Sequence, residues 1–295
     1  MFRLSGPALA GHFAMLLFSL LVAGSFAMGA LVANEIAPLA LNALRFWIAA
    51  AMVGAIAYGT GSVKPGDFKS PWRHLVLAGV FSIYFVLMFE GLKTAPSVSA
   101  AAVFTLTPIL SAIFGYVLLR QVTTSRMALA LGIGALGAIW VIFRADLAAI
   151  VGFDVGRGEM IYFWGCVSHA IYTPMVRKLN RGETALSFTF GTLLAGAMIL
   201  SVIGMPDIIA TDWAGLRPMV WVTILYTAVF SSAVTFTLLQ FASLRLPSAK
   251  VMAYTYLTPC WVMVWDVVLG GALPSAMIFI GIGLTVLALG LLLRE

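Results

Sequence analysis

Ser168 and His169 are the two neighbouring side chains of this 295-residue sequence that most resemble a nucleophile and its base. Adjacent residues on a helix point about 100° apart, so the two side chains cannot form such a pair directly. A serine from another segment, such as Ser25 or Ser111, would have to replace Ser168. The sequence has no HExxH motif and no aspartate cluster that would hold a metal. We therefore expect a protein that is not an enzyme and has no cofactor, with an intramembrane hydrolase as the strongest enzymatic alternative.

Three glycines match a nucleotide-binding motif as a string of letters. Gly132, Gly134 and Gly137 have the GxGxxG spacing, but that motif functions in a turn between a strand and a helix. Here the glycines lie inside a continuous apolar segment, where small residues favour close contact between helices. The sequence also has no GxxxxGK[ST] loop, so we expect no ATP site.

The composition indicates a membrane protein. Hydrophobic residues make up 62% of the chain, charged residues only 9%, and the mean hydropathy is +1.06. A soluble domain carries about 25% charged residues. The apolar segments are near the length of about 20 residues that a transmembrane helix requires, which favours an all-α integral membrane protein. The excess of Lys and Arg is scattered through short loops without a basic patch, so we expect no nucleic-acid partner.

Polar loops divide the chain into ten segments of spanning length. The predicted spans are 12–32, 38–58, 74–92, 96–118, 126–143, 159–176, 184–204, 218–241, 247–270 and 274–293. Lys and Arg residues then predict the orientation, because they are enriched in cytoplasmic loops. With the N-terminus inside, the inner side has eleven of them: Arg3, Lys64, Lys69, Arg73, Arg120, Arg126, Arg177, Lys178, Arg181, Arg245 and Arg294. The outer side has four: Lys93, Arg144, Arg157 and Arg217. We expect a bacterial inner-membrane protein with both termini in the cytoplasm.

An internal repeat relates the two halves of the chain. With an offset of 151 residues, APSVSAAAVFTLTP (95–108) aligns with LPSAKVMAYTYLTP (246–259), so that both Pro-Ser and Leu-Thr-Pro coincide. Five spans per half is an odd number, so the second half would enter the bilayer upside down. We therefore predict two inverted five-helix repeats, 1–150 and 151–295, in one membrane domain. This architecture is typical of secondary transporters, with a substrate site between the repeats near the membrane midplane.

These features together resemble a known family. Ten spans in a five-plus-five repeat, Arg45 in LNALRFW, and Leu-Thr-Pro in the fourth and ninth spans resemble the EamA branch of the drug/metabolite transporter superfamily. The segment YFWGCVSHAIYTPMVRKLNRG (162–182) is most similar to YddG-type amino acid exporters. The resemblance implies efflux of amino acids, aromatic ones among them, by alternating access through a central cavity. The alternative is a multidrug or other metabolite exporter with the same fold.

Aromatic residues with a polar group at mid-depth are the candidate substrate ligands. We select Tyr84, Trp164 and Tyr254, and add His169 and also Phe104, which lies one turn before Pro108. Such residues bind an apolar side chain by contact area and fix an amine and a carboxylate by a few hydrogen bonds. The alternative for each of these residues is that it only packs against neighbouring helices and binds no substrate. For His169 this would be a buried neutral histidine. The expected partners are a small-molecule substrate and the lipid bilayer, and the expected state is a monomer.

Two prolines and two charges complete the prediction. Pro108 and Pro259 each remove a backbone hydrogen bond at equivalent places in the two halves, so we predict paired hinges, with simple packing kinks as the alternative. Thr107 and Thr258 would bond to the freed carbonyls. Arg45 and Glu90 are assigned a gating or structural role, with substrate contact as the alternative. The two would pair, or Arg45 would extend towards Glu35. Because no carboxylate lies near the midplane, we expect no acidic proton relay.

Overall fold

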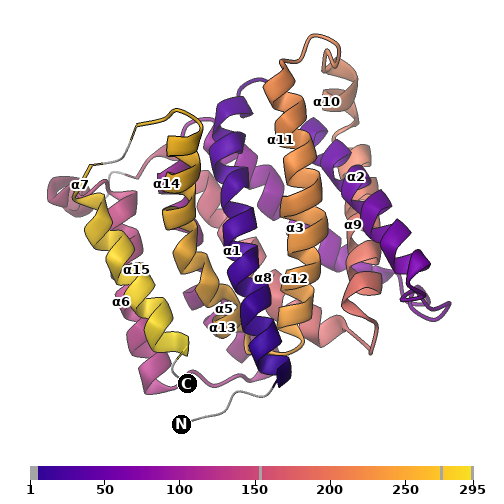
Figure 1. The fold of residues 1–295 in the computed structure, drawn as a ribbon, viewed down its shortest axis with the longest axis horizontal. Coiled ribbons are helices and arrows are strands. Elements are labelled where there is room, and N and C mark those ends of the chain that lie inside the picture. Colours follow the sequence, from indigo (N-terminus) through magenta and orange to yellow (C-terminus); the bar gives the residue numbers. More distant parts are fainter. Residues whose placement is uncertain (1–5, 153–154, 273–274, 294–295) are drawn as a thin grey trace.

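The computed structural model describes residues 6–152, 155–272 and 275–293, and every regular element within them is a helix (Figure 1). The helices are α1 (Gly6–Val32), α2 (Pro38–Gly59), α3 (Trp72–Leu92), α4 (Ser97–Phe104), α5 (Thr107–Leu119), α6 (Ser125–Ile142), α7 (Leu147–Gly152), α8 (Arg157–Leu179), α9 (Ala185–Ile203), α10 (Met205–Ala210), α11 (Pro218–Ala228), the π-helix η1 (Val229–Val234), α12 (Thr235–Ser243), α13 (Ser248–Ala253), the 3₁₀-helix η2 (Tyr254–Leu257), α14 (Thr258–Val268) and α15 (Ile278–Leu293).

Eight helical segments of the described residues are long and apolar enough to cross a membrane. They are 7–32, 38–59, 72–92, 97–119, 125–142, 185–203, 218–243 and 248–268. The predicted sixth span lies on α8, which is long but carries more polar residues, and the predicted tenth lies on α15, which has 16 residues. The prediction of an all-helical, multi-pass membrane protein is confirmed, and the count of ten spans stays a prediction.

The bundle has two polar ends. α1 begins and α15 ends at the same end, which we call the terminal face, and the other end is the opposite face (Figure 1). The connections α2–α3 and α8–α9 lie at the terminal face, whereas α1–α2 and α10–α11 lie at the opposite face. Arg3, Asp154 and Arg294, which contribute to the predicted orientation and its test, lie outside the described residues.

Helices from the two halves of the chain pack against each other. α3 lies along α8, α2 along α9, α6 along α15, and α1 along α12. The packing of α6 against Gly281 of α15 and Tyr256 of η2 explains two of the three motif glycines. A Cβ atom on Gly137 would lie 2.5 Å from the carbonyl oxygen of Gly281, and one on Gly134 would overlap the Tyr256 hydroxyl. Close helix packing therefore requires Gly134 and Gly137, as expected for small residues between transmembrane helices.

The fourth and ninth predicted spans are both interrupted in the middle. α4 and α13 begin at Ser97 and Ser248, and α5 and α14 begin at Thr107 and Thr258. Both pairs of starts are 151 residues apart, which is the offset of the sequence repeat. Pro108 and Pro259 stand in the first turn of α5 and α14, where a missing N–H costs no helical hydrogen bond.

The two interruptions are in contact, since α4 packs against α14 and α5 against α13. Thr107 Oγ1 donates to the Phe104 carbonyl at 2.7 Å, as expected, and lies 3.2 Å from Thr255 Oγ1. The expectation for Thr258 is wrong, because its hydroxyl has no partner among the described residues. Thr255, in the 3₁₀ turn η2, instead donates its Oγ1 hydroxyl to the Met252 carbonyl at 2.8 Å.

Candidate functional site

A cluster of rings fills the centre of the bundle between α3, α4, α8 and α12. We call it the central aromatic cluster, and its members are Phe81, Tyr84, Phe85, Phe104, Tyr162, His169, Tyr172 and Phe236. The ring centroids of Phe81 and Tyr172 are 4.1 Å apart in a stacked arrangement, and those of Tyr84 and His169 are 4.4 Å apart edge to face. These are the favourable geometries for aromatic pairs.

Helical spacing explains why these rings meet. Phe81, Tyr84 and Phe85 are three and four residues apart on α3, and His169 and Tyr172 are three apart on α8. Side chains at these separations share one helix face. Because α3 and α8 pack along their length, the two aromatic faces are pressed together.

Two polar atoms in and beside the cluster have no hydrogen-bond partner among the described residues. They are His169 Nδ1 and Gln240 Oε1. Gln240 Nε2 donates to the Tyr172 hydroxyl at 3.0 Å, which holds the amide of α12 against the cluster. A buried polar atom without a partner costs about 1–3 kcal/mol, so such atoms are rare unless a ligand or water completes them. The cluster therefore offers ring faces together with an unpaired imidazole nitrogen and an unpaired amide oxygen.

The structure brings three of the five predicted ligands together. Tyr84, Phe104 and His169 all belong to the central aromatic cluster and are buried. Tyr254 is also buried, but its hydroxyl lies 3.0 Å from His12 Nδ1 on α1, away from the cluster.

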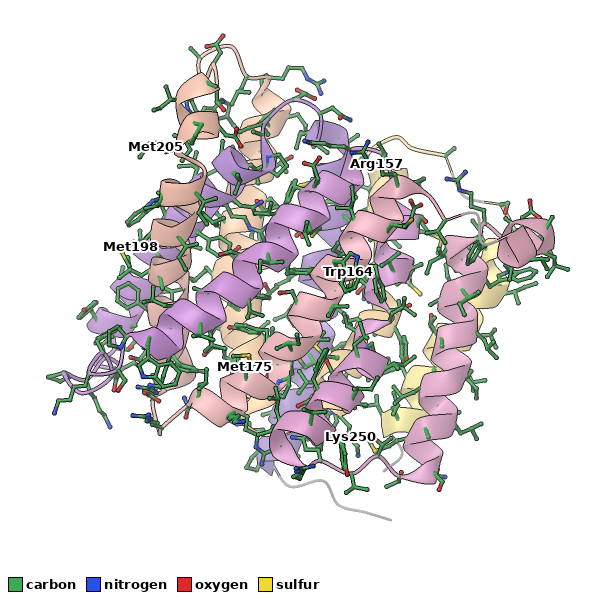
Figure 2. The ribbon with its side chains drawn as sticks, turned by 180° about the vertical axis from the view of Figure 1, so that it is seen from behind. Arg157, Trp164, Met175, Met198, Met205 and Lys250 are labelled. Carbon is green, nitrogen blue, oxygen red and sulfur yellow. The ribbon has the colours of Figure 1, made fainter. Side chains whose placement is uncertain are left out.

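Trp164 is placed differently from the expectation. Its side chain is 63% exposed and lies on the outer surface of α8 (Figure 2). Trp164 follows the cluster residue Tyr162 by two positions, which is about 200° around the helix, so the two rings point to opposite sides. Ser168 does not line open space either, because its hydroxyl donates to the Val80 carbonyl of α3 at 2.6 Å.

Several cluster residues were not selected from the sequence. These are Phe81, Phe85, Tyr162, Tyr172 and Phe236, and Gln240 beside the cluster was not selected either. The signal for the residues on α3 and α8 was the three-and-four spacing of aromatics within each predicted span. Gln240 had a different signal, as the single amide side chain in its predicted span.

Arg45 is fully buried and is held by neutral groups. Its Nε donates to Ser232 Oγ at 2.6 Å, Nη2 to the Ser231 carbonyl at 2.8 Å, and Nη1 to Asn42 Oδ1 at 3.4 Å. Its guanidinium carbon stands 3.9 Å above the centroid of the Phe85 ring.

Both pairings expected for Arg45 are wrong. Glu90 bonds to Lys93 at 2.7 Å, because the two are three residues apart at the end of α3. Glu35 bonds to Arg217, which precedes α11. The partners of Arg45 come instead from η1, where a π-helical turn presents a serine hydroxyl and a backbone carbonyl.

One ion pair between the two halves of the chain lies at each polar end, in addition to Glu90–Lys93 at the opposite face. At the terminal face, Arg73 Nη1 lies 2.6 Å from Glu183 Oε1, and the side chains are only 3% and 5% exposed. Burial raises the pKa of Glu183, but hydrogen bonds from the backbone N–H groups of Arg181 and of Glu183 itself and from Arg73 outweigh it, so its pKa is lowered overall. At the opposite face, the Glu35–Arg217 pair is 27% and 63% exposed, and hydrogen bonding to Arg217 lowers the pKa of Glu35.

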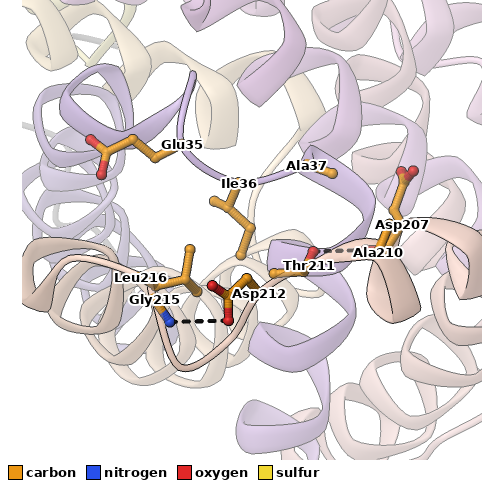
Figure 3. A pocket seen from close by; sticks show the side chains of 9 residues that line it. All are labelled: Glu35, Ile36, Ala37, Asp207, Ala210, Thr211, Asp212, Gly215 and Leu216. Carbon is orange, nitrogen blue, oxygen red and sulfur yellow. Dashed lines mark hydrogen bonds between the residues drawn. The ribbon is translucent and has the colours of Figure 1, made fainter.

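A surface pocket of about 410 Å³ lies beside this second pair at the opposite face (Figure 3). It is lined by Glu35, Ile36, Ala37, Asp207, Ala210, Thr211, Asp212, Gly215 and Leu216. The Asp212 carboxylate accepts the Gly215 N–H at 3.2 Å and so holds its own loop. None of the predicted ligands lines this pocket, in which Glu35 pairs with Arg217 and Asp212 holds its own loop.

Comparison with known proteins gives the family. The model of the EamA-like transporter family matches the chain twice, over residues 9–143 and 156–294. The uncharacterized transporter YyaM of Bacillus subtilis is 25% identical over 277 residues, which are 93% of this chain and 90% of YyaM. An S-adenosylmethionine/S-adenosylhomocysteine transporter of Chlamydia muridarum is 26% identical over 201 residues, 64% of this chain and 62% of that protein. A solved crystal structure shares the fold, with a TM-score of 0.73, 21% identity and coverage of 98% of this chain and 97% of the other. The chain therefore belongs to the EamA-like transporter family and is a membrane transporter, not an enzyme.

Proposed function

We propose that this transporter exports amino acids with apolar or aromatic side chains across the bacterial inner membrane by alternating access. The observation that carries the proposal is the central aromatic cluster with its two unpaired polar atoms, His169 Nδ1 and Gln240 Oε1. Ring faces supply contact area for an apolar side chain and attract an ammonium group through their π electrons. Gln240 Oε1 can accept a hydrogen bond from that ammonium group.

Three observations support two inverted repeats, 1–150 and 151–295. The family model matches once in each half, and the interruptions of the fourth and ninth predicted spans share the offset of 151 residues. The two ion pairs are the third observation. Glu35 follows the first span and Glu183 the sixth, while Arg73 begins the third and Arg217 precedes the eighth.

In each pair, the glutamate follows the first span of one half and the arginine stands before or at the start of the third span of the other half. The two pairs differ in which half supplies the glutamate, and they lie at opposite faces of the bundle. With both termini in the cytoplasm, Arg73–Glu183 closes the cytoplasmic side and Glu35–Arg217 spans the periplasmic side. Alternating access requires such paired closures, of which one opens in each state. Pro108 and Pro259, at the starts of α5 and α14, are the hinges of this proposal.

A second candidate substrate is S-adenosylmethionine or S-adenosylhomocysteine. It is favoured by the Chlamydia relatives, which are named for these compounds. Both are α-amino acids that carry an aromatic base, and S-adenosylmethionine also has a sulfonium cation, which aromatic ring faces attract. The two candidates therefore share the chemistry of an amino acid head group with an aromatic or apolar remainder.

Counterflow into proteoliposomes tests the proposal. We expect uptake of labelled L-phenylalanine or L-methionine, or of S-adenosylmethionine, to exceed that of glycine. His169→Ala should reduce this uptake, whereas the surface variant Trp164→Ala should not. Equal flux of every compound through protein-containing and empty liposomes would contradict the proposal.

Topology reporters test the orientation separately. Reporters at Lys69 and Arg181 should read cytoplasmic and a reporter at Asp154 periplasmic. A periplasmic signal at Arg181 would contradict the five-plus-five inversion.

A further inference from the structure

Arg45 is a buried cation without a counter-ion among the described residues. The ion pairs in this part of the chain are Arg73–Glu183, Lys93–Glu90 and Arg217–Glu35, and none includes Arg45. The residue lies near the middle of the first half of α2, within a predicted membrane span. An ionised side chain at such a place is costly and is usually kept for function.

The groups around Arg45 solvate its charge but do not neutralise it. They are the Ser232 hydroxyl and the Ser231 carbonyl of η1, the amide oxygen of Asn42 and the face of the Phe85 ring. Ser231 is itself fixed, since its Oγ donates to the Leu21 carbonyl of α1 at 3.0 Å. The guanidinium is therefore held in one orientation by a preformed frame.

This frame leaves part of the guanidinium weakly engaged. A guanidinium carries five N–H donors, and the three described bonds use one donor on each nitrogen. The bond from Nη1 to Asn42 is 3.4 Å long, beyond the usual range of 2.7–3.2 Å. A carboxylate matches the remaining fork of N–H groups and would form short, charge-assisted bonds in place of the weak one.

Phe85 connects Arg45 with the central aromatic cluster. One face of this ring lies under the guanidinium, and its centroid is 4.6 Å from that of Tyr84 and 5.0 Å from that of Phe81. A molecule with its carboxylate on Arg45 would therefore extend its remaining atoms along the rings. On the other side of Phe81, Tyr172 and Gln240 continue the same surface.

We infer that Arg45 is the receptor for the carboxylate of the transported substrate. The assignment rests on the proposed function and narrows it, because it makes a carboxylate obligatory and excludes amines and other cations that lack one. It also explains why the chain keeps an unneutralised arginine in a span, since the substrate supplies the missing negative charge.

The first test requires no variant. Binding of L-phenylalanine and of L-phenylalaninamide to the purified wild-type protein in nanodiscs is compared, as is binding of S-adenosylmethionine and its decarboxylated form. In whichever pair binds, the compound with the carboxylate should bind at least about tenfold more tightly than the compound without it. The reason is that one hydrogen bond to a charged group is worth roughly 1.5–3 kcal/mol. Equal affinity within a pair would overturn the carboxylate assignment and leave the proposed function intact. Binding of neither pair would contradict the proposed function itself.

Variants of Arg45 then localise the preference. Arg45→Gln should lose most of the preference for the acid and keep the affinity for the amide, while Arg45→Lys should keep part of it. Ser232→Ala is the matched control, because it removes one bond of the frame but leaves the guanidinium, and it should keep the preference. Equal losses for acid and amide in Arg45→Gln would make Arg45 a structural residue. If Arg45→Gln does not fold, the ratio of the affinities for acid and amide is compared between Arg45→Lys, which should lower it, and Ser232→Ala, which should not.

Discussion

Arg73 and Glu183 are 110 residues apart in the chain, yet their side chains form a 2.6 Å ion pair that is almost completely shielded from water. Arg73 Nη1 also donates to the Leu179 carbonyl at 2.8 Å, so the pair fastens the start of α3 to the end of α8. At the other end of the bundle, Glu35 and Arg217 are joined in the same way but with much greater exposure. The protein is therefore held more firmly at its terminal face.

The difference in burial predicts a difference in stability. Glu183→Gln should lower the free energy of unfolding by roughly 3–5 kcal/mol, because it leaves Arg73 buried without its counter-ion. Glu35→Gln should cost less than about 1 kcal/mol, as is usual for exposed pairs. Thermal unfolding of both variants in one detergent measures the difference. Equal shifts of the two would contradict the closed terminal face.

The lowered pKa of Glu183 predicts an acid-dependent loss of the same closure. A carboxylate whose pKa is lower in the folded protein contributes stability that is complete above its ordinary pKa of about 4.3. This contribution disappears as the pH falls through the lower, folded value. Unfolding temperatures from pH 6 down to about pH 3 should thus decline more steeply in the wild type than in Glu183→Gln. Parallel declines would show that other carboxylates determine the acid sensitivity.

The prolines at the starts of α5 and α14 should affect transport more than folding. Pro108→Ala and Pro259→Ala allow a continuous helix through each interruption, which should disfavour one access state and slow counterflow. Insertion into the membrane, measured by the amount of protein after purification, should be unchanged. Full transport by the double variant would reduce both prolines to details of packing.

Phe104 and Trp164 should differ in their effect on substrate preference. Phe104→Leu keeps a similar volume but removes a ring that contacts both Tyr84 and His169, so binding of aromatic or cationic substrates should weaken by about 1 kcal/mol. Trp164→Ala changes a surface side chain and should leave the relative transport of large and small amino acids unaltered. A selective loss for large side chains in Trp164→Ala would return this residue to the substrate site.

Transport should depend little on an imposed proton gradient. His169 is the one imidazole of the central aromatic cluster, and no carboxylate pairs with it among the described residues. We expect accumulation to follow the substrate gradient alone in proteoliposomes with or without a pH difference. Proton coupling would be shown if the pH difference drives uphill accumulation and His169→Ala abolishes this pH-driven accumulation but leaves the remaining transport intact.

The membrane class and the positions of most helices followed from the sequence because hydropathy and loop polarity determine them. The interruptions of two spans were also predictable, since Pro108 and Pro259 remove backbone donors at matching positions. The π-helix η1 was not predictable, because no proline or glycine marks Val229–Val234, and its bonds to Arg45 join residues 186 and 187 positions apart in the chain.

The central aromatic cluster was predicted in part, for a reason that lies in helix geometry, and its role as a substrate site stays a prediction. Tyr84, Phe104 and His169 were selected for their depth in the membrane, and depth is readable from position along a span. Which side of a helix faces the centre is not readable when aromatic residues lie on both sides, as Tyr162 and Trp164 do on α8. Trp164 was therefore selected at a suitable depth but on the exposed side, and Gln240 was overlooked.

The isolation of Arg45 has an electrical consequence. Moving a full charge across the membrane changes its electrical free energy by about 2.3 kcal/mol for each 100 mV of potential. A displacement of Arg45 over one tenth of the membrane therefore changes this energy by about 0.2 kcal/mol. Its frame joins α2 to η1 across the two halves of the chain. If the halves rock against each other, the empty protein moves an uncompensated positive charge. A zwitterionic amino acid on Arg45 adds no net charge, because its ammonium group offsets its carboxylate, so the loaded protein moves the same single positive charge. The loaded step and the empty step then sense the membrane voltage alike, whereas a substrate with one net negative charge would make the loaded step insensitive to it.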